Sequence, residues 1–385
     1  MGIVLAIGIM LGFLASAIGV YQFVWPLLKR HVLRRPDSEP ATREDVGTLA
    51  QRIKELEGKL NRGCEYLGGL PETVNKTLKA AYEEARILQL EGYEAQNGYK
   101  HREAIDRFTR ALDLAENPCQ RVALHNMRGN SYFWLSEYGK AQADCEQVIL
   151  LSKHIPEPHA SAQAYAAALG NLGIIQFHYG HLDLAERYLR KALRIQTQIG
   201  DSLCEAIQLQ SLGNVYLQRG ELDKSEEHHK EALKIHREIG NREGEAMQLS
   251  GLGNVYFQRG ELDKSEEHHK EALKIHREIG NREGEANALG NLGNVCDKRG
   301  DPDKAEEYYK EALGVHREIG DNLGEANGLG NLGLVYKDRD DIGNAREYLQ
   351  QAHAIYQEIG ACGEGPEKVQ QALEELERQQ QERGE

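Results

Sequence analysis

The chain of 385 residues has few aromatic residues and few cysteines. Phenylalanine and tryptophan supply only six and two residues, against forty glycines. A chain poor in aromatic residues and rich in Ala, Leu, Glu, Lys and Arg favours helices over sheets, so we predict an all-α fold. The six cysteines lie far apart and form no CxxC pair: Cys64, Cys119, Cys145, Cys204, Cys296 and Cys362. This spacing argues against a zinc site and a disulfide framework, and is typical of a reducing compartment.

The chain also lacks an excess of positive charge. Its formal net charge is -14, whereas binding to nucleic-acid phosphates requires clustered cations. Motifs for catalysis are missing as well, since the sequence contains no glycine-rich phosphate loop after a strand, no GxSxG motif and no cysteine–histidine pair with an orienting group. We therefore predict no nucleic-acid partner, no enzymatic activity and no cofactor.

Residues 2–28 carry no charged side chain. A helix needs roughly 20 apolar residues to cross the hydrocarbon core of a bilayer, so the sequence predicts a transmembrane helix, with an anchor and basic flank at residues 1–35. Four basic residues follow the span, namely Lys29, Arg30, Arg34 and Arg35. By the positive-inside rule they place the remaining chain on the cytoplasmic side of a single-pass membrane protein. A cleaved signal peptide is the alternative, but no basic residue precedes the apolar run.

Two features near the N-terminus predict self-association. Gly8, Gly12 and Ser16 place small side chains on one face of the predicted span, where a second span could approach closely. In the linker at residues 36–79, apolar residues at coiled-coil spacing predict a short amphipathic helix: Val46, Leu49, Ile53, Leu56 and Leu60. Together these features favour a parallel homodimer. The pattern covers little more than two heptads, so a monomeric amphipathic helix remains the alternative.

Most of the remaining sequence is built from a repeat of 40 residues. Five glycines mark its period: Gly173, Gly213, Gly253, Gly293 and Gly333. Small residues follow each glycine at two fixed offsets, as Ala185 and Ala192 follow Gly173. The same frame extends upstream to Gly92 and, less perfectly, to Gly129, which gives seven units. Because small residues let two antiparallel helices pack closely, we predict seven stacked helix–turn–helix units.

The turns within each unit also follow a pattern. Segments such as RGELD place a glycine at the end of the first helix, where it can take the left-handed conformation, and the second helix ends at IGD or IGN. Asp223 and Glu226 stand three residues apart, as do their equivalents in other units. We interpret this Asp-x-x-Glu pattern as a capping box that starts the second helix.

The small residue in the first helix and the two alanines in the second resemble the tetratricopeptide repeat (TPR). The 40-residue unit is most similar to the form found in Pins-type adaptors and kinesin light chains. The resemblance covers residues 80–362 and implies a right-handed α-solenoid of about seven TPR units. Residues 363–385 are expected to form a terminal capping helix and tail, with Val369, Leu373 and Leu376 on its apolar face.

One stretch of 29 residues, QRGELDKSEEHHKEALKIHREIGNREGEA, occurs at both 218–246 and 258–286 and contains a histidine pair. In the repeat register, His229 and His269 fall where another unit has Tyr309, which is a packing position of the second helix. Adjacent helical residues point about 100° apart, so neither pair is suited to holding one ion at the ~2.0 Å of a Zn–N bond. We predict partly exposed packing residues and no metal site.

In TPR proteins the first helices line the concave surface, and partner contacts recur at fixed offsets from the repeat glycine. Transferred to this sequence, the offsets give a candidate partner-binding groove of eight residues: Asn214, Asn254, Asn294, Gln218, Gln258, Lys298, Asn287 and Asn327. Carboxamides both donate and accept hydrogen bonds, so a row of asparagines is suited to an extended peptide backbone. The alternative is that these asparagines bond between repeats and only stiffen the stack.

These features together predict a membrane-anchored TPR adaptor or scaffold that binds a protein or peptide partner in its groove. The alternative is a structural protein that assembles into homo-oligomers through the anchor, the coiled coil and the repeats.

Overall fold

The computed structural model describes residues 72–97, 100–115, 117–361 and 363–383. These residues form α-helices and no strand, which confirms the predicted all-α class for this part of the chain. The helices are α4 (Glu72–Asn97), α5 (His101–Leu114), α6 (Pro118–Trp134), α7 (Tyr138–Ser152), α8 (Pro158–His178), α9 (Leu182–Ile199), α10 (Ser202–Gln218), α11 (Leu222–Glu238), α12 (Arg242–Arg259), α13 (Leu262–Ile279), α14 (Arg282–Arg299), α15 (Pro302–Ile319), α16 (Asn322–Asp338), α17 (Ile342–Ile359) and α18 (Glu364–Arg383).

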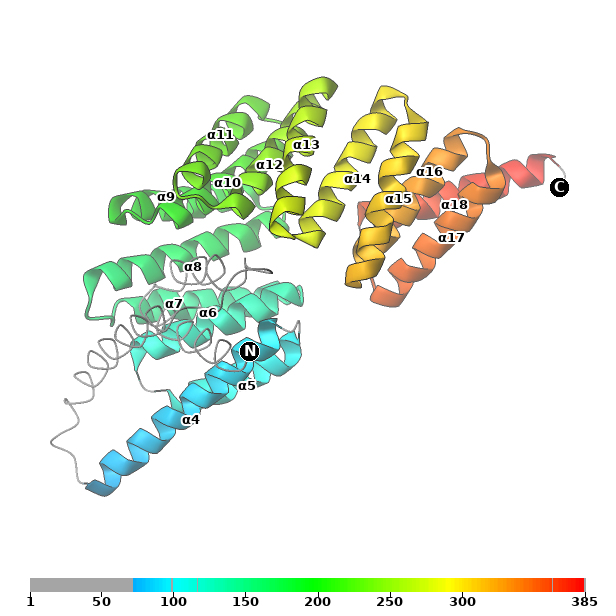
Figure 1. Ribbon diagram of the computed structural model, residues 1–385. Coiled ribbons are helices and arrows are strands. Elements are labelled where there is room, and N and C mark those ends of the chain that lie inside the picture. The colour runs from blue at the N-terminus through cyan, green and yellow to red at the C-terminus, as the bar shows by residue number, and fades with distance from the viewer. Residues whose placement is uncertain (1–71, 98–99, 116, 362, 384–385) are drawn as a thin grey trace, which may run out of the picture. The chain divides into compact units, whose positions relative to one another are not determined.

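The helices follow one another in pairs joined by short turns, from α4 and α5 to α16 and α17 (Figure 1). The chain divides into two units, unit 1 at Met1–Gln208 and unit 2 at Leu209–Glu385. Within each unit, every helix packs mainly on its neighbours in sequence, and first helices also contact the first helix of the next pair. Each unit therefore has the one-dimensional packing of a repeat protein.

Glycines end many of these helices as the sequence predicts. Gly260 follows α12 with φ 80° and Gly280 follows α13 with φ 70°, both in the left-handed region. The next helix then begins with a side-chain cap, since Asn281 Oδ1 accepts a hydrogen bond from the Gly284 amide at 2.8 Å. Both turns are thus specified by single residues of the repeat.

The Asp-x-x-Glu pattern does not form a capping box. The N-cap residue of α13 is Glu261, which makes no side-chain capping hydrogen bond, and Asp263 already lies inside the first turn. Asp263 and Glu266 pair instead with Arg299 of the following repeat, with 2.8 Å between Asp263 Oδ1 and the guanidinium. The same pairing recurs at Arg259 with Asp223 and Glu226, and at Arg339 with Asp303 and Glu306. These carboxylates therefore tie each second helix to the next repeat.

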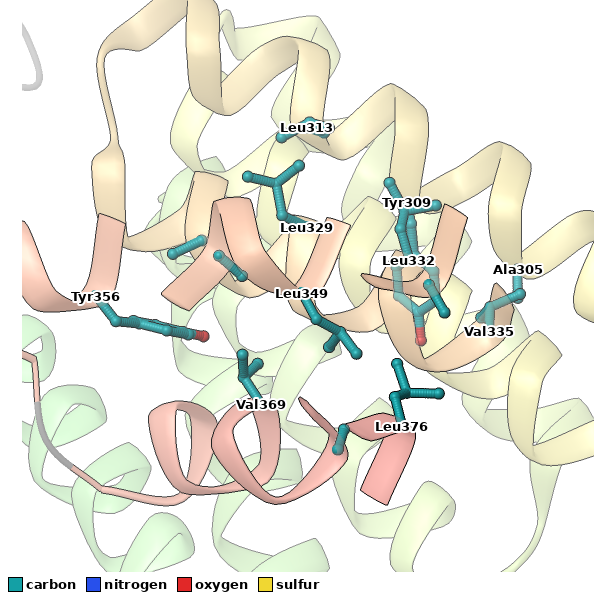
Figure 2. Close-up of a cluster of buried hydrophobic side chains, with 14 of the residues drawn as sticks. Ala305, Tyr309, Leu313, Leu329, Leu332, Val335, Leu349, Tyr356, Val369 and Leu376 are labelled. Atoms are coloured by element: carbon teal, nitrogen blue, oxygen red, sulfur yellow. The ribbon is translucent and has the colours of Figure 1, made fainter. Parts of the chain in front are cut away.

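The core consists of side chains that pack between consecutive helices. In unit 2, Leu329 and Leu332 of α16 meet Leu349 of α17, and Val369 and Leu376 of α18 pack on the same cluster (Figure 2). All five are at most 2% exposed. Helix α18 therefore covers the apolar side of the last helix pair. Burial of apolar surface stabilises by ~25 cal/mol per Å² and is the main stabilising term of such a core.

Two glycines of α14 differ sharply in their surroundings. A Cβ at Gly293 would lie 2.5 Å from the ring of Tyr309, whereas a Cβ at Gly290 would meet no atom within 4 Å. The repeat glycine is therefore required for close packing of α14 on α15, while Gly290 is not.

We expect Gly293→Ala to destabilise unit 2 relative to Gly290→Ala by about 1–3 kcal/mol, the usual cost of overpacking. Both variants gain the same helix propensity, so Gly290→Ala alone should stabilise by about 0.5–1 kcal/mol. Urea denaturation of the two variants measures the difference. Equal free energies of unfolding would show that Tyr309 moves aside without cost.

The ends of the helical region differ in part from the expected boundaries. Helix α4 begins at Glu72, inside the segment predicted as linker, and α18 extends over Glu364–Arg383. The predicted coiled-coil residues 46–60 lie outside the described residues, and so does the prediction of a homodimer that depends on them.

The predicted single-pass membrane localisation requires correction. None of the helices formed by residues 72–97, 100–115, 117–361 and 363–383 is both long and apolar enough to cross a bilayer, because polar and charged side chains interrupt their apolar faces. The segment from which a span was predicted, residues 2–28, lies outside the described residues.

Candidate partner-binding site

The first helices of unit 2 lie side by side. Helix α14 contacts both α12 and α16 directly, whereas each second helix packs between the first helices of its own and the next pair. We call the face formed by α12, α14, α16 and residues 209–218 of α10 the inner row. All eight residues of the predicted groove belong to these helices. The positions taken over from other TPR proteins therefore all fall on the first helix of a repeat.

Five of the eight side chains are free to bind a partner. Asn214 and Asn254 are half-buried, and Gln218, Gln258 and Asn287 are exposed. None of the five makes a side-chain hydrogen bond with the described part of the chain. A half-buried carboxamide without a partner retains both its donor and its acceptor for a ligand.

The other three side chains are engaged within the protein. Asn294 Oδ1 accepts a hydrogen bond from the Tyr309 hydroxyl at 2.8 Å, and Asn327 Oδ1 accepts one from the Tyr356 hydroxyl at 2.6 Å. Lys298 Nζ donates to the backbone carbonyl of Phe257 at 3.0 Å and lies 4.2 Å from the centroid of its ring. The two asparagines are thus bonded to the second helix of their own repeat, and Lys298 bonds the preceding repeat. The alternative of asparagine bonds between repeats is not what these contacts show.

The residue opposite the repeat glycine explains why equivalent asparagines differ. His229, His269 and Tyr309 occupy this position in successive repeats and are 1%, 1% and 3% exposed. The tyrosine hydroxyl reaches the asparagine that follows the repeat glycine, but the shorter imidazole does not. His229 Nδ1 instead bonds Gln248 Oε1 at 3.0 Å.

The two histidines are thus packing residues, as predicted, but they are buried rather than partly exposed. Burial lowers the pKa of His269 to about 4, and burial likewise lowers the pKa of His229. Both rings are therefore neutral near pH 7.

The histidine pairs do not form a metal site in the described structure. The neighbouring residue His228 is half-buried, and its Nδ1 bonds the Lys224 carbonyl oxygen at 2.8 Å. No group of three His, Cys, Asp or Glu side chains is placed to hold an ion in the part of the chain from residue 72 onward that the structure describes. The predictions that the chain needs no metal and is not an enzyme remain predictions.

The apolar side chains beside the asparagines were not predicted as part of the site. Met247 of α12 is 45% exposed, and Phe257 near the other end of the same helix is half-buried beneath Lys298. Met247 occupies the same repeat offset as Asn287 and Asn327, so this signal was present in the sequence. The inner row thus combines free carboxamides with exposed apolar surface.

The family model described as tetratricopeptide repeat matches residues 120–198, 203–278, 245–318 and 286–358. The chain is a tetratricopeptide repeat protein. The matched segments overlap and cover more than half of the sequence, in agreement with the helix pairs and with the resemblance stated above. The similarity to the 40-residue form of Pins-type adaptors and kinesin light chains remains a prediction.

Solved structures with the same fold share little sequence identity with this chain. Aspartyl phosphate phosphatase F from Bacillus subtilis is similar at 12% identity and a TM-score of 0.62, over 91% of this chain and 94% of that protein. RapI in its apo form is similar at 14% identity and a TM-score of 0.58, over 72% and 99%. The Rap conjugation gene regulator of plasmid pLS20, in complex with the Phr* peptide, is similar at 16% identity and a TM-score of 0.51, over 78% and 97%.

At such low identity the likeness to this TPR chain is one of fold. No curated protein matches the sequence.

Proposed function

We propose that this TPR protein binds an extended protein or peptide segment on the inner row of unit 2. The observation that carries the proposal is the difference between equivalent asparagines. Asn214 and Asn254 are half-buried and have no hydrogen-bond partner in the described chain, whereas Asn294 is bonded to Tyr309.

The chemistry of the inner row is suited to a peptide backbone. Each free asparagine can donate to a carbonyl and accept from an amide of the bound segment, and Gln218 and Gln258 add exposed carboxamides on the same two helices. Met247 and Phe257 supply apolar contacts for side chains of the partner. A structural neighbour was solved with the Phr* peptide, which supports a peptide as the class of partner.

A peptide selected from a random display library on the full-length chain provides the probe. We expect its affinity to fall at least about thirtyfold in the double variant Asn214→Ala/Asn254→Ala, because each asparagine loses at least one hydrogen bond of ~1 kcal/mol and tenfold corresponds to ~1.4 kcal/mol. Calorimetric titration measures the change, and circular dichroism verifies that the helices are retained.

Asn344→Ala is the matched control. Asn344 is exposed on the second helix α17, where its side chain bonds Asp341 at 2.7 Å. This variant should bind the peptide as the wild type does. Equal loss of affinity in both variants, or none in the double variant, would place the peptide elsewhere.

A further inference from the structure

Unit 1 contains a pocket of about 540 Å³ that no predicted site residue lines. It opens between the first helices α4, α6 and α8, and Cys204 of α10 closes one side. Met127, Phe133, Ala164 and Ile174 contribute to its mainly apolar wall. This volume lies within the range of pockets that hold small organic groups.

The described side chains that line the pocket include no acidic or strongly basic residue. None of the described side chains that line it is an Asp, Glu, Lys or Arg. Burial raises the pKa of the Cys145 thiol to about 12, and burial also raises the pKa of Cys119, so both remain uncharged thiols. The pocket is therefore unsuited to an anion or a metal ion and suited to a neutral ligand.

The His125 side chain in the pocket wall is held by a hydrogen-bond network. His125 is only 5% exposed, and its Nδ1 lies 2.7 Å from Asp144 Oδ1. Arg128 donates from Nε to Asp144 Oδ2 at 3.0 Å and to Thr109 Oγ1 at 3.1 Å from its terminal nitrogen. Burial alone would raise the pKa of Asp144, but the hydrogen bonds from His125 and Arg128 lower it below its ordinary value. Asp144 is therefore an ionised acceptor.

This network fixes the tautomer of His125. An ionised carboxylate can only accept, so Nδ1 carries the proton and donates it to Asp144. The proposal applies to the neutral form of the ring, in which Nε2 is then an acceptor. His125 Nε2 is buried without a hydrogen-bond partner in the described structure, and so is Asn126 Oδ1, on the next residue of the same pocket wall. Both residues line the pocket, and the two buried acceptors beside it lack a partner in the described structure, which favours a ligand that donates a hydrogen bond.

We propose that this pocket binds a neutral aromatic ring that carries a hydrogen-bond donor, of which phenol is the simplest case, with the donor directed at His125 Nε2. Phe133 and Met127 offer favourable contacts to the ring. The ring can come from a free small molecule or from a tyrosine side chain of a peptide. Because the pocket shares no residue with the inner row of unit 2, the proposal is independent of the proposed function.

Ligand-observed NMR titration of the full-length chain tests the need for the donor. The probes are 4-methylphenol and 4-methylanisole, which differ by one methyl group that removes the O–H donor. We expect 4-methylphenol to bind at least tenfold more tightly, because the ether cannot donate a hydrogen bond to His125 Nε2. Equal affinities, or no binding of the phenol, would overturn the proposal.

Two variants locate the binding. Asn126→Leu removes one acceptor and leaves the His125–Asp144–Arg128 network intact, and His125→Phe removes the other. His125→Phe removes the acceptor to which the O–H donates and should lower the preference for 4-methylphenol over 4-methylanisole about tenfold. Asn126→Leu, and Lys140→Ala outside the pocket, keep that acceptor and should retain the preference. If His125→Phe does not fold, the two probes on the wild type still decide, because equal affinities for 4-methylphenol and 4-methylanisole contradict the proposal.

A third probe identifies the source of the ring. Binding of N-acetyl-tyrosinamide at least as tightly as 4-methylphenol supports a tyrosine side chain as the natural occupant. Binding of 4-methylphenol alone supports a free small molecule. If N-acetyl-tyrosinamide binds, but no more tightly than its O-methyl ether, the proposed need for a hydrogen-bond donor is overturned.

Discussion

Lowering the pH from 7.5 to 5.0 is expected to destabilise unit 2 by about 2 kcal/mol through His269 alone. Its folded-state pKa is lowered by burial from 6.5 to about 4. The unfolded chain therefore binds a proton more readily below pH 6.5, and stability is lost as the pH falls from 6.5 towards 4. Burial lowers the pKa of His229, His236 and His276 in the same direction, so the total loss should exceed that of one residue. Urea denaturation at the two pH values measures it.

The variant His269→Tyr tests the cause of this pH dependence. Tyr309 occupies the same position one repeat later and packs against the equivalent glycine, so the substitution uses a side chain that this architecture already accepts. We expect the pH-dependent loss to shrink by about 2 kcal/mol in the variant, which lacks the titrating group. An unchanged loss between pH 7.5 and 5.0 would assign the acid sensitivity to other groups.

Glu226 affects stability over a different pH range. Burial would raise its pKa, but hydrogen bonds from Lys230, Tyr256 and Arg259 lower it to about 2. Its contribution to stability is present above pH 4.5 and is lost only as the pH falls from there towards 2. The histidine effect at pH 5.0 is thus measured while this carboxylate is still ionised.

Replacing Asp144 by asparagine is expected to destabilise unit 1 by about 3–5 kcal/mol, the usual cost of removing one partner of a buried ion pair. Asp144 is 2% exposed and receives hydrogen bonds from both His125 and Arg128. The asparagine has nearly the same shape, but it leaves the Arg128 guanidinium without a balancing charge. Urea denaturation of the purified variant gives the free energy of unfolding.

Lys140→Ala is the control for this prediction. Lys140 pairs with Glu137 at 2.6 Å, but its side chain is 64% exposed. An exposed ion pair contributes little to stability, so this variant should be nearly as stable as the wild type. Similar losses in the two variants would mean that burial of Asp144 does not set the energy of its pairing.

Much of the fold could be predicted because the repeat is encoded locally. Glycines with positive φ end the helices, and Ala272 and Ala312 are almost fully buried where small residues are required. The capping box could not be distinguished from an inter-repeat ion pair, because Asp263 has the right spacing for the first and its true partner, Arg299, lies 36 residues away. The pair between Asp263 and Arg299 forms only when adjacent repeats stack on each other, so it could not be predicted from local spacing.

The sequence could predict which helices carry the candidate asparagines, but not which of their carboxamides are already hydrogen-bonded within the protein. The repeat register places Asn214, Asn254 and Asn294 at equivalent positions, and the structure puts all three on first helices. Whether each carboxamide is free depends on the length of one side chain on the following helix, where Tyr309 reaches its asparagine and His269 does not. The pocket at His125 could not be predicted, since it lies between helices of different repeats and Asp144 is 19 residues away.

The measurement that tests the proposed peptide site most directly is the side-chain amide spectrum of the asparagines, recorded on asparagine-labelled protein with and without the selected peptide. We predict that the NH₂ signals of Asn214 and Asn254 shift on binding, while that of Asn294, whose oxygen is bonded to Tyr309, does not. Unperturbed signals for Asn214 and Asn254 at saturating peptide would contradict binding on the inner row.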